Sequence, residues 1–204
     1  MKIRSNDSFS RLGDQFGLLK SQSSRIFSKT VRQISHFSKT LVFFPDRSSI
    51  VKDLPIAFRA RYSHVYAIID AFGIQIERPS NSVYQALTWP DYKKCNTLKF
   101  LMVCTPDGTI ILVSEALRGR IRYCELFGQS GMLGMLPDDC AVMADRGFKN
   151  LQALLNEKNC NLLRPPSVMS DSKPTKLEVL ETKSIASIWI HVERVIGRLR
   201  RFRL

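Results

Sequence analysis

The first part of the chain carries apolar residues at the spacing of an α-helix. Polar and apolar residues alternate at this spacing from 8 to 41, and Gly17 predicts the end of a first helix. Ser21 or Ser23 is a suitable N-cap for a second helix. The apolar positions that repeat are Ile26, Phe27, Val31, Ile34, Phe37 and Leu41. The pattern therefore predicts two helices joined by a glycine-containing turn.

The second of these helices also carries the basic residues Arg25, Lys29 and Arg32. A short helix, a turn with glycine and a second helix with basic residues are typical of a helix-turn-helix. Because such helix pairs are common in proteins, we interpret residues 1–44 only as a partial helix-turn-helix-like region. Residues 45–66 contain two prolines and mixed charge, and are expected to form a connector.

The pattern changes to that of β-strands from residue 67 onward. Residues 67–77 are β-branched and apolar at first, and then alternate between apolar and polar side chains. Two further apolar runs, at 98–105 and 109–115, flank the turn sequence TPDG and so predict a β-hairpin. Three sequential antiparallel strands are therefore expected.

The rest of this region alternates helices with strands. The pattern predicts a short helix at 127–136, a fourth strand in DCAVMAD, a helix after Gly147 and a short fifth strand in NCNLL. A long amphipathic helix follows, with apolar residues at Ile185, Ile188, Val192, Val195 and Leu199. This order predicts an α/β domain over residues 67–204, with a mixed sheet flanked by helices.

Positive charge is concentrated at the two ends of the sequence. The formal net charge is +13, of which residues 1–66 contribute +8 and residues 194–204 contribute +5, while residues 67–193 are neutral. A neutral body with basic ends is suited to binding a phosphate backbone. The same distribution fits a basic protein that binds no nucleic acid, so charge leaves both interpretations open.

Composition disfavours membrane, secreted and zinc-binding proteins. No apolar run approaches the roughly 18 residues of a membrane span, and the first residues lack the apolar segment of a signal peptide. The five cysteines include no CxxC pair, and neither they nor the three histidines show the spacing of zinc ligands. We therefore expect a soluble intracellular protein with reduced, buried thiols.

Three acidic residues lie either at the end of a predicted strand or at the margin of the buried face of a predicted helix. The apolar runs YAIID and AVMAD end on Asp70 and Asp145, and ligand chemistry in α/β sheets gathers at strand ends. Glu193 lies roughly 100° around the final helix from Val192, and so at the margin of its buried face. Carboxylates are the ligands that Mg²⁺ or Mn²⁺ prefers, and two such ions would promote phosphodiester cleavage.

Ordinary structural roles explain the same three acids. Asp70 could cap a turn, and Glu193 could pair with a basic residue of its own helix. Asp145 could pair with Arg146 or Arg194. Spacing alone does not specify a metal site, so both interpretations remain open at this point.

Five segments that follow one another along residues 54–204 carry a family resemblance. They are IIDAFGIQIERPS, YKKCNTLKFLMVCTPDGTIILVSEALRGR, SGMLGMLPDDCAVMADRGF, LLRPP and IASIWIHVERVIGRLRRFRL. As a set they resemble the DDE superfamily endonucleases of the Harbinger-like transposase type, including transposase-derived proteins. The upstream stretch DQFGLLKSQSSRIFSKTV resembles the second half of the helix-turn-helix that precedes the nuclease core in such proteins.

This resemblance implies an RNase H-like fold and a two-metal mechanism. The catalytic, metal-binding acids would be Asp70, Asp145 and Glu193, with Mg²⁺ or Mn²⁺ as cofactor, DNA as partner and the nucleus as location. A homo-oligomer is left open, and no membrane partner is expected. The residues expected to contact DNA are Arg25, Lys29, Arg32, Lys99, Arg194 and Arg198, although Arg194 could instead hold one of the acids by an ion pair.

The chain also departs from the family pattern around the three acids. The family usually has a Ser-Asp pair where Arg122 and Tyr123 stand, an acidic residue in place of Gly73, and an arginine in place of Trp189. Because all three acids are present, the leading function is still a metal-dependent DNA endonuclease or transposase-like protein. The alternative is a catalytically inactive, transposon-derived DNA-binding protein, and a structural protein without a nucleic-acid role is a third interpretation.

Overall fold

The structure is a computed structural model, and it describes residues 2–165, 175–199 and 201. The chain divides into two compact units, one of Met1–Phe43 with Arg194–Leu204 and the other of Phe44–Glu193. The division predicted from the sequence, at residues 44 and 66, stays a prediction. Among the described residues, no helix combines the length and the apolar character needed to cross a membrane.

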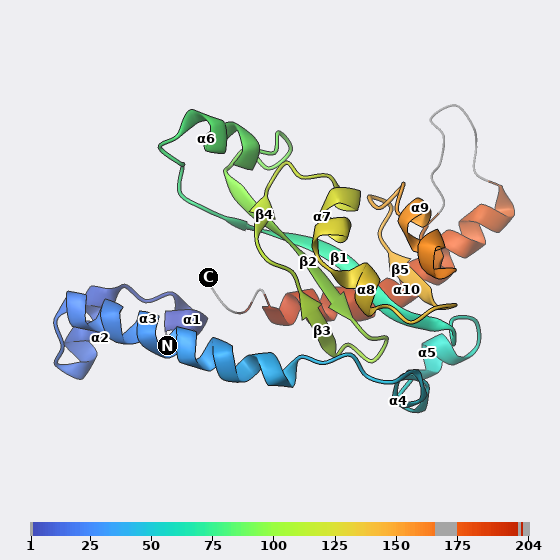
Figure 1. Cartoon of the computed structure of the whole chain (residues 1–204), viewed down its shortest axis with the longest axis horizontal. Coiled ribbons are helices and arrows are strands. Elements are labelled where there is room, and N and C mark those ends of the chain that lie inside the picture. The colour runs from blue at the N-terminus through green and yellow to red at the C-terminus, as the bar shows by residue number, and fades with distance from the viewer. Residues whose placement is uncertain (1, 166–174, 200, 202–204) are drawn as a thin grey trace. The chain divides into compact units, whose positions relative to one another are not determined.

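The larger unit is built on one mixed sheet. Its strands are β1 Val65–Gln75, β2 Thr97–Cys104, β3 Ile110–Val113, β4 Leu117–Arg118, β5 Ala141–Ala144 and β6 Asn161–Leu163. The strand order is β3-β2-β1-β5-β6, with the short β4 paired to β2 (Figure 1). β1 runs antiparallel to β2 and parallel to β5. The sheet confirms the mixed α/β fold predicted from the sequence and is consistent with an RNase H-like arrangement.

The β2–β3 hairpin forms at the predicted TPDG turn. Gly108 adopts a φ of 91°, and its N–H donates to the carbonyl of Thr105 at 2.9 Å. The carboxylate of Asp107 accepts hydrogen bonds from the hydroxyls of Thr105 and Thr109. The turn is thus closed by both backbone and side-chain hydrogen bonds, which are typical of Asp and Gly at such positions.

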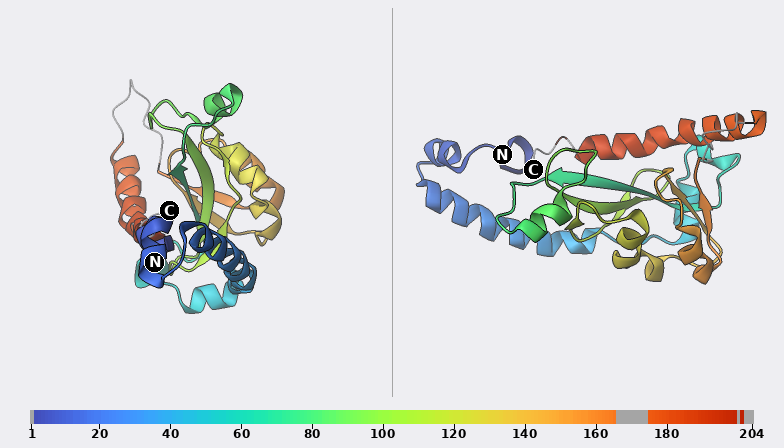
Figure 2. Two further views of the ribbon diagram at one scale, coloured as in Figure 1. Left: turned by 90° about the vertical axis from the view of Figure 1, so that its left-hand side faces the viewer. Right: turned by 90° about the horizontal axis from the view of Figure 1, so that it is seen from above.

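Helices cover both faces of this sheet. α7 Tyr123–Gln129 and α8 Met132–Met135 lie on one face, whereas α10 Lys176–Leu199 runs along the other (Figure 2). The hydroxyl of Tyr62 donates to the hydroxyl of Ser184 on α10 at 3.1 Å. Ile185 and Ile188 of the predicted apolar face are buried, while the side chain of Val192 lies outside the described residues.

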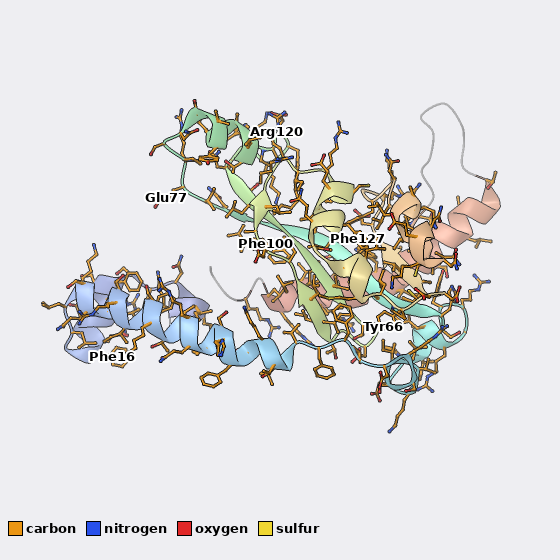
Figure 3. The ribbon with its side chains drawn as sticks, viewed as in Figure 1. Phe16, Tyr66, Glu77, Phe100, Arg120 and Phe127 are labelled. Carbon is orange, nitrogen blue, oxygen red and sulfur yellow. The ribbon has the colours of Figure 1, made fainter. Side chains whose placement is uncertain are left out.

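The core of the larger unit lies on both sides of β1 and β2. Phe127 of α7, labelled in Figure 3, is fully buried. On the sheet itself Leu101, Met102 and Val103 have no solvent-exposed surface. A strand with buried residues on both faces is typical of the centre of a sheet covered by two helical layers.

Several short helices differ from the prediction. α7 and α8 replace one helix at 127–136, because Gly131 takes a left-handed φ of 74° between them. The helix after Gly147 is short, since a single turn and a 3₁₀ turn end at Asn159, whose φ is 52°. The unpredicted or shortened elements are α4 Arg47–Lys52, α5 Ile56–Arg59, α6 Ser82–Thr88, α9 Gln152–Leu155 and η2 Asn156–Lys158.

The smaller unit contains the predicted pair of helices. Its elements are α1 Lys2–Ser5, α2 Phe9–Phe16, α3 Lys20–Ser38 and the 3₁₀ helix η1 Lys39–Leu41. Gly17 ends α2 with a left-handed φ of 65°, as predicted. The predicted capping of the second helix by Ser21 or Ser23 is wrong. α3 begins before them, and the Leu19 N–H donates instead to the side-chain Oε1 of Gln22 at 2.9 Å.

Candidate active site

The sheet places Asp70 and Asp145 next to each other. β1 and β5 are parallel neighbours, and their last registered pair is Ile69 with Ala144. Asp70 and Asp145 each follow that pair by one residue. Because neighbouring strands lie about 4.8 Å apart, the two backbones present their carboxylates from adjacent positions. The structure therefore brings together the two acids that end the apolar runs of the sequence.

Asp70 lies on the sheet face that α10 covers. The register between β1 and β2 is unbroken here and pairs Asp70 with Met102 and Gly73 with Lys99. Side chains alternate between faces along a strand, so Asp70 and Lys99 point to opposite faces. The side chain of Lys99 reaches residues at the start of α7, which leaves Asp70 on the α10 side (Figure 2). One carboxylate oxygen of Asp70 accepts a hydrogen bond from the N–H of Ala71 at 2.7 Å.

Asp145 begins a tight turn directly after β5. Its side chain is exposed, and its carbonyl accepts the N–H of Phe148 at 3.1 Å. The backbone of Gly147 lies against the ring of Tyr123, because a Cβ added to this glycine would stand 2.5 Å from Cε2 of that ring. A residue larger than glycine would thus force either the turn or the ring to move.

The ring of Tyr123 packs over this turn. It stacks on the ring of Phe148, with centroids 4.7 Å apart and an interplanar angle of 29°. Burial raises the pKa of the Tyr123 hydroxyl, and the charges of Tyr92, Asp70 and Asp145 raise it further. The tyrosine therefore lies within electrostatic range of both acids and remains neutral at physiological pH.

Lys99 is buried beneath the same ring. Only 7% of the residue is exposed, and its Nζ donates to the carbonyl of Ile121 at 2.8 Å. The Nζ also lies 4.9 Å from the centroid of the Tyr123 ring, within the range of a cation–π interaction. Burial lowers the pKa of Lys99, and the charge of Lys93 lowers it further. Its predicted contact with DNA stays a prediction, and in this structure its ammonium group is directed at protein groups.

Glu193, the third predicted acid, is exposed on α10, beyond the margin position expected from the sequence. Across the residues that the structure describes, no three His, Cys, Asp or Glu side chains are grouped so as to hold a metal ion. The structure thus makes Asp70 and Asp145 neighbours, and their role as metal ligands stays a prediction. The contribution of Glu193 stays a prediction.

Among the described residues, the structure shows none of the ion pairs considered as ordinary roles for Asp145 and Glu193. Within the described parts of the chain, neither Asp145 nor Glu193 has a Lys or Arg nitrogen within 4.0 Å. Arg146 and Arg194, the partners considered for Asp145, are both exposed. Both carboxylates are exposed to solvent.

The predicted DNA-contacting residues of α3 share one face of that helix. Arg25, Lys29 and Arg32 follow one another at intervals of four and three residues, and all three are exposed. Arg194 and Arg198 of α10 are also exposed. The geometry is compatible with contacts to phosphates, but those contacts stay predictions.

Sequence reasoning does not predict how Tyr123 and Lys99 pack. In the sequence, Tyr123 is a departure from the family pattern, and Lys99 is expected to face DNA. The sequence signal that could have indicated their packing is the glycine after Arg146, since Gly147 leaves room for a ring. No local pattern indicated which ring would fill it.

Comparison with known proteins places this geometry in a family. The family model of the DDE superfamily endonucleases matches residues 69–204 and so includes all three acids. The protein named "Putative nuclease HARBI1" of Rattus norvegicus is 22% identical over 144 residues, covering 68% of this chain and 40% of the relative. The human protein of that name is 23% identical over 124 residues, covering 60% of this chain and 35% of the relative. No solved structure matches the chain significantly.

The match therefore spans two fifths or less of the length of these relatives. It confirms the resemblance drawn from the sequence, since the matched region begins one residue before Asp70 and continues through Glu193. The chain belongs to the DDE superfamily endonuclease family.

Proposed function

We propose that the chain is a divalent-metal-dependent DNA endonuclease, in which Asp70 and Asp145 hold the metal and Glu193 supplies a third carboxylate. The observation that carries this proposal is the register of β1 and β5, which makes Asp70 and Asp145 neighbours in a chain of an endonuclease family. Membership of a nuclease family implies a nucleic-acid substrate. DNA as the substrate and the nucleus as location are both part of this proposal.

The two aspartates fit the ligand preference of Mg²⁺ or Mn²⁺. Both metals favour carboxylate oxygens and usually retain water or substrate phosphate among their ligands. When bound, such ions activate the attacking oxygen and stabilise the leaving oxygen of a phosphodiester. The Ala71 N–H orients Asp70, while the exposed side chain of Asp145 is open to substrate. Glu193 belongs to the helix that runs along the face on which Asp70 lies.

DNA binding would rest on exposed basic side chains of α3 and α10. Arg25, Lys29 and Arg32 form one exposed stripe on α3, and Arg194 and Arg198 are exposed on α10. Each phosphate neutralised by such a residue releases counterions, so affinity for DNA is expected to fall steeply with salt. The net charge of +13 supports this mode of binding.

The test is cleavage of DNA in the presence of Mg²⁺ or Mn²⁺ by the full chain and by Asp145→Asn. We expect the variant to cleave at least about 100-fold more slowly, because it lacks a direct ligand and even groups that only orient ligands contribute 10- to 100-fold. Asp139→Asn is the matched control. Asp139 is an exposed residue with a φ of 53°, a conformation that asparagine tolerates. Equal cleavage by wild type and Asp145→Asn would refute the nuclease proposal.

A catalytically inactive DNA-binding protein is the second candidate. It is favoured by the exposed position of Glu193 and by the lack of a three-acid group in the described residues. Under this alternative, DNA affinity still falls with salt. Calorimetry then detects either no Mn²⁺ binding or Mn²⁺ binding that is equal in wild type and Asp70→Asn. A DNA affinity independent of salt would contradict both candidates, because neutralising phosphates must release counterions.

A further inference from the structure

We propose that Tyr123 is a positioning residue for Asp145, and that its ring holds the turn at 145–148 in place. The consequence for cleavage rests on the proposed nuclease function, whereas the effect on the turn does not. Tyr123 contacts both the turn and Lys99. The ring thereby links β2, the start of α7 and the residues that follow β5.

The contact with the turn is close enough to couple the two positions. The Tyr123 ring occupies the space where residue 147 would carry a Cβ, with Cε2 at 2.5 Å and Cδ2 at 2.9 Å from that point. It also stacks on Phe148, whose side chain is 1% exposed. Since the Phe148 N–H bonds to the carbonyl of Asp145, a displaced ring would release the turn that presents Asp145.

Lys99 of β2 also contacts the ring of Tyr123. Among the described residues no carboxylate oxygen lies within 4.0 Å of its Nζ. The buried ammonium group instead uses the carbonyl of Ile121 and the face of the Tyr123 ring. A buried charge is costly unless such partners satisfy it. Both partners belong to the short segment that leads into α7, so Lys99 fastens that segment to β2.

The segment before Tyr123 is fastened at a second point. The Arg120 N–H donates to the carbonyl of Leu87 at 3.1 Å, and the Ile121 N–H donates to that of Arg118 at 2.9 Å. Gly119 has no room for a Cβ, because Thr97 and Thr88 lie against it. The segment at the base of the ring is therefore packed against β2, which allows the ring to restrain a turn 24 residues further along the sequence.

Hydrogen exchange of the Phe148 amide tests the effect on the turn. Exchange of a single amide reports local opening of its hydrogen bond. Tyr123→Phe keeps the ring and should leave the Phe148 amide protected as in wild type. Tyr123→Leu removes the ring and should speed its exchange by about tenfold or more, while amides in the centre of β2 keep their protection. Equal exchange at Phe148 in all three proteins would overturn the proposal.

Gly147→Ala provides a second readout that does not depend on Tyr123→Leu alone. In the wild-type background the added methyl group should lower the midpoint of denaturant unfolding, because it meets the ring. In the Tyr123→Leu background the same change should lower the midpoint by less than half as much, since the aromatic ring is gone. Equal decreases in both backgrounds would show that ring and turn are independent, and would refute the coupling.

DNA cleavage separates the two proposals. If the chain cleaves DNA, Tyr123→Leu should lower kcat by about 10- to 100-fold with KM for DNA nearly unchanged, and Tyr123→Phe should restore it. Wild-type cleavage with an unimpaired Tyr123→Leu would overturn the positioning role. If wild type does not cleave DNA at all, the nuclease proposal fails, and the exchange and unfolding data still decide whether Tyr123 holds the turn.

Discussion

The sheet unit and the helical unit are stabilised in opposite ways. The first five residues of β1 are buried on both faces of the sheet, whereas Ser23 is the single buried residue of the nineteen in α3. Ile34 and Phe37 of α3 are 51% and 73% exposed. Asp70 and Asp145 thus belong to a well-packed sheet, whereas Arg25, Lys29 and Arg32 lie on a helix with little buried surface. For the DNA endonuclease proposed above, this difference predicts that mutations can separate cleavage from DNA binding.

The largest effect is expected for the acids of the sheet. Asp70→Asn should reduce DNA cleavage by about 100-fold or more, because it removes a direct oxygen ligand for the metal. DNA affinity and the unfolding midpoint should change little, since the substitution preserves size and the frame of β1. Cleavage assays, filter binding and denaturant unfolding on the same preparation measure the three quantities.

Glu193→Gln sharpens this comparison between sheet and helix. If α10 completes the metal site, this variant loses as much cleavage as Asp70→Asn. Cleavage close to that of wild type would show instead that Glu193, exposed in the structure, contributes nothing to the reaction.

The next largest effect is expected from the basic stripe of α3. Changing Arg25, Lys29 and Arg32 together to Gln should weaken DNA binding by about tenfold or more and lower the salt slope by about 3, or roughly 1 for each phosphate contact. Lys20→Gln is the control, because Lys20 is exposed on the same helix but five residues from Arg25, and so on another face. An unchanged salt slope in the triple variant would remove α3 from the DNA interface.

Prediction from sequence succeeded where a local pattern determined the structure. Apolar runs predict β1, β2, β3, β5 and β6, and the TPDG turn follows from residues that favour one backbone conformation. Asp70 and Asp145 were predicted at strand ends, and the parallel pairing of β1 with β5 makes those ends neighbours. In each case the information lies within a few consecutive residues or in the rules that connect strands.

Prediction failed where distant residues decide the outcome. Lys99 alternates with apolar residues on β2, and nothing in that pattern indicates that its charge would be buried beneath a ring from α7. The stacking of Tyr123 on Phe148 joins segments that no local periodicity connects. α3 begins earlier than predicted for a local reason. Gln22, inside its first turn, accepts the hydrogen bond of the Leu19 N–H, so a serine N-cap is not needed.

The two units should also differ in the stability that their aromatic residues contribute. Phe127→Ala in the sheet unit should lower the free energy of unfolding by about 3–5 kcal/mol, because the residue has no exposed surface and its removal leaves a cavity. Phe37→Ala on α3 should change it by no more than about 0.5 kcal/mol, because that side chain is largely in solvent. Denaturant unfolding followed by circular dichroism measures both. A large loss for Phe37→Ala would mean that α3 is packed in solution.

The smallest effect concerns the pH dependence that the buried Lys99 gives to the sheet unit. Burial lowers the pKa of Lys99 in the folded chain, so the unfolded chain binds this proton more tightly. Stability therefore rises with pH between the lowered pKa and the ordinary value of 10.5, where the unfolded state holds more protons. Below that window the folded chain bears the full cost of the buried ammonium group.

Lys99→Met keeps the length of the side chain and removes the charge. The stability of wild type relative to this variant should consequently increase as pH rises from about 7 to about 10, and unfolding curves of both proteins across that range measure it. Tyr123→Phe, which retains both Lys99 and the ring above it, should follow wild type over the same range. A difference between wild type and Lys99→Met that stays constant or shrinks with pH would mean that the ammonium group is hydrated in solution. In that case the ammonium group of Lys99 would not hold the Tyr123 ring against β2.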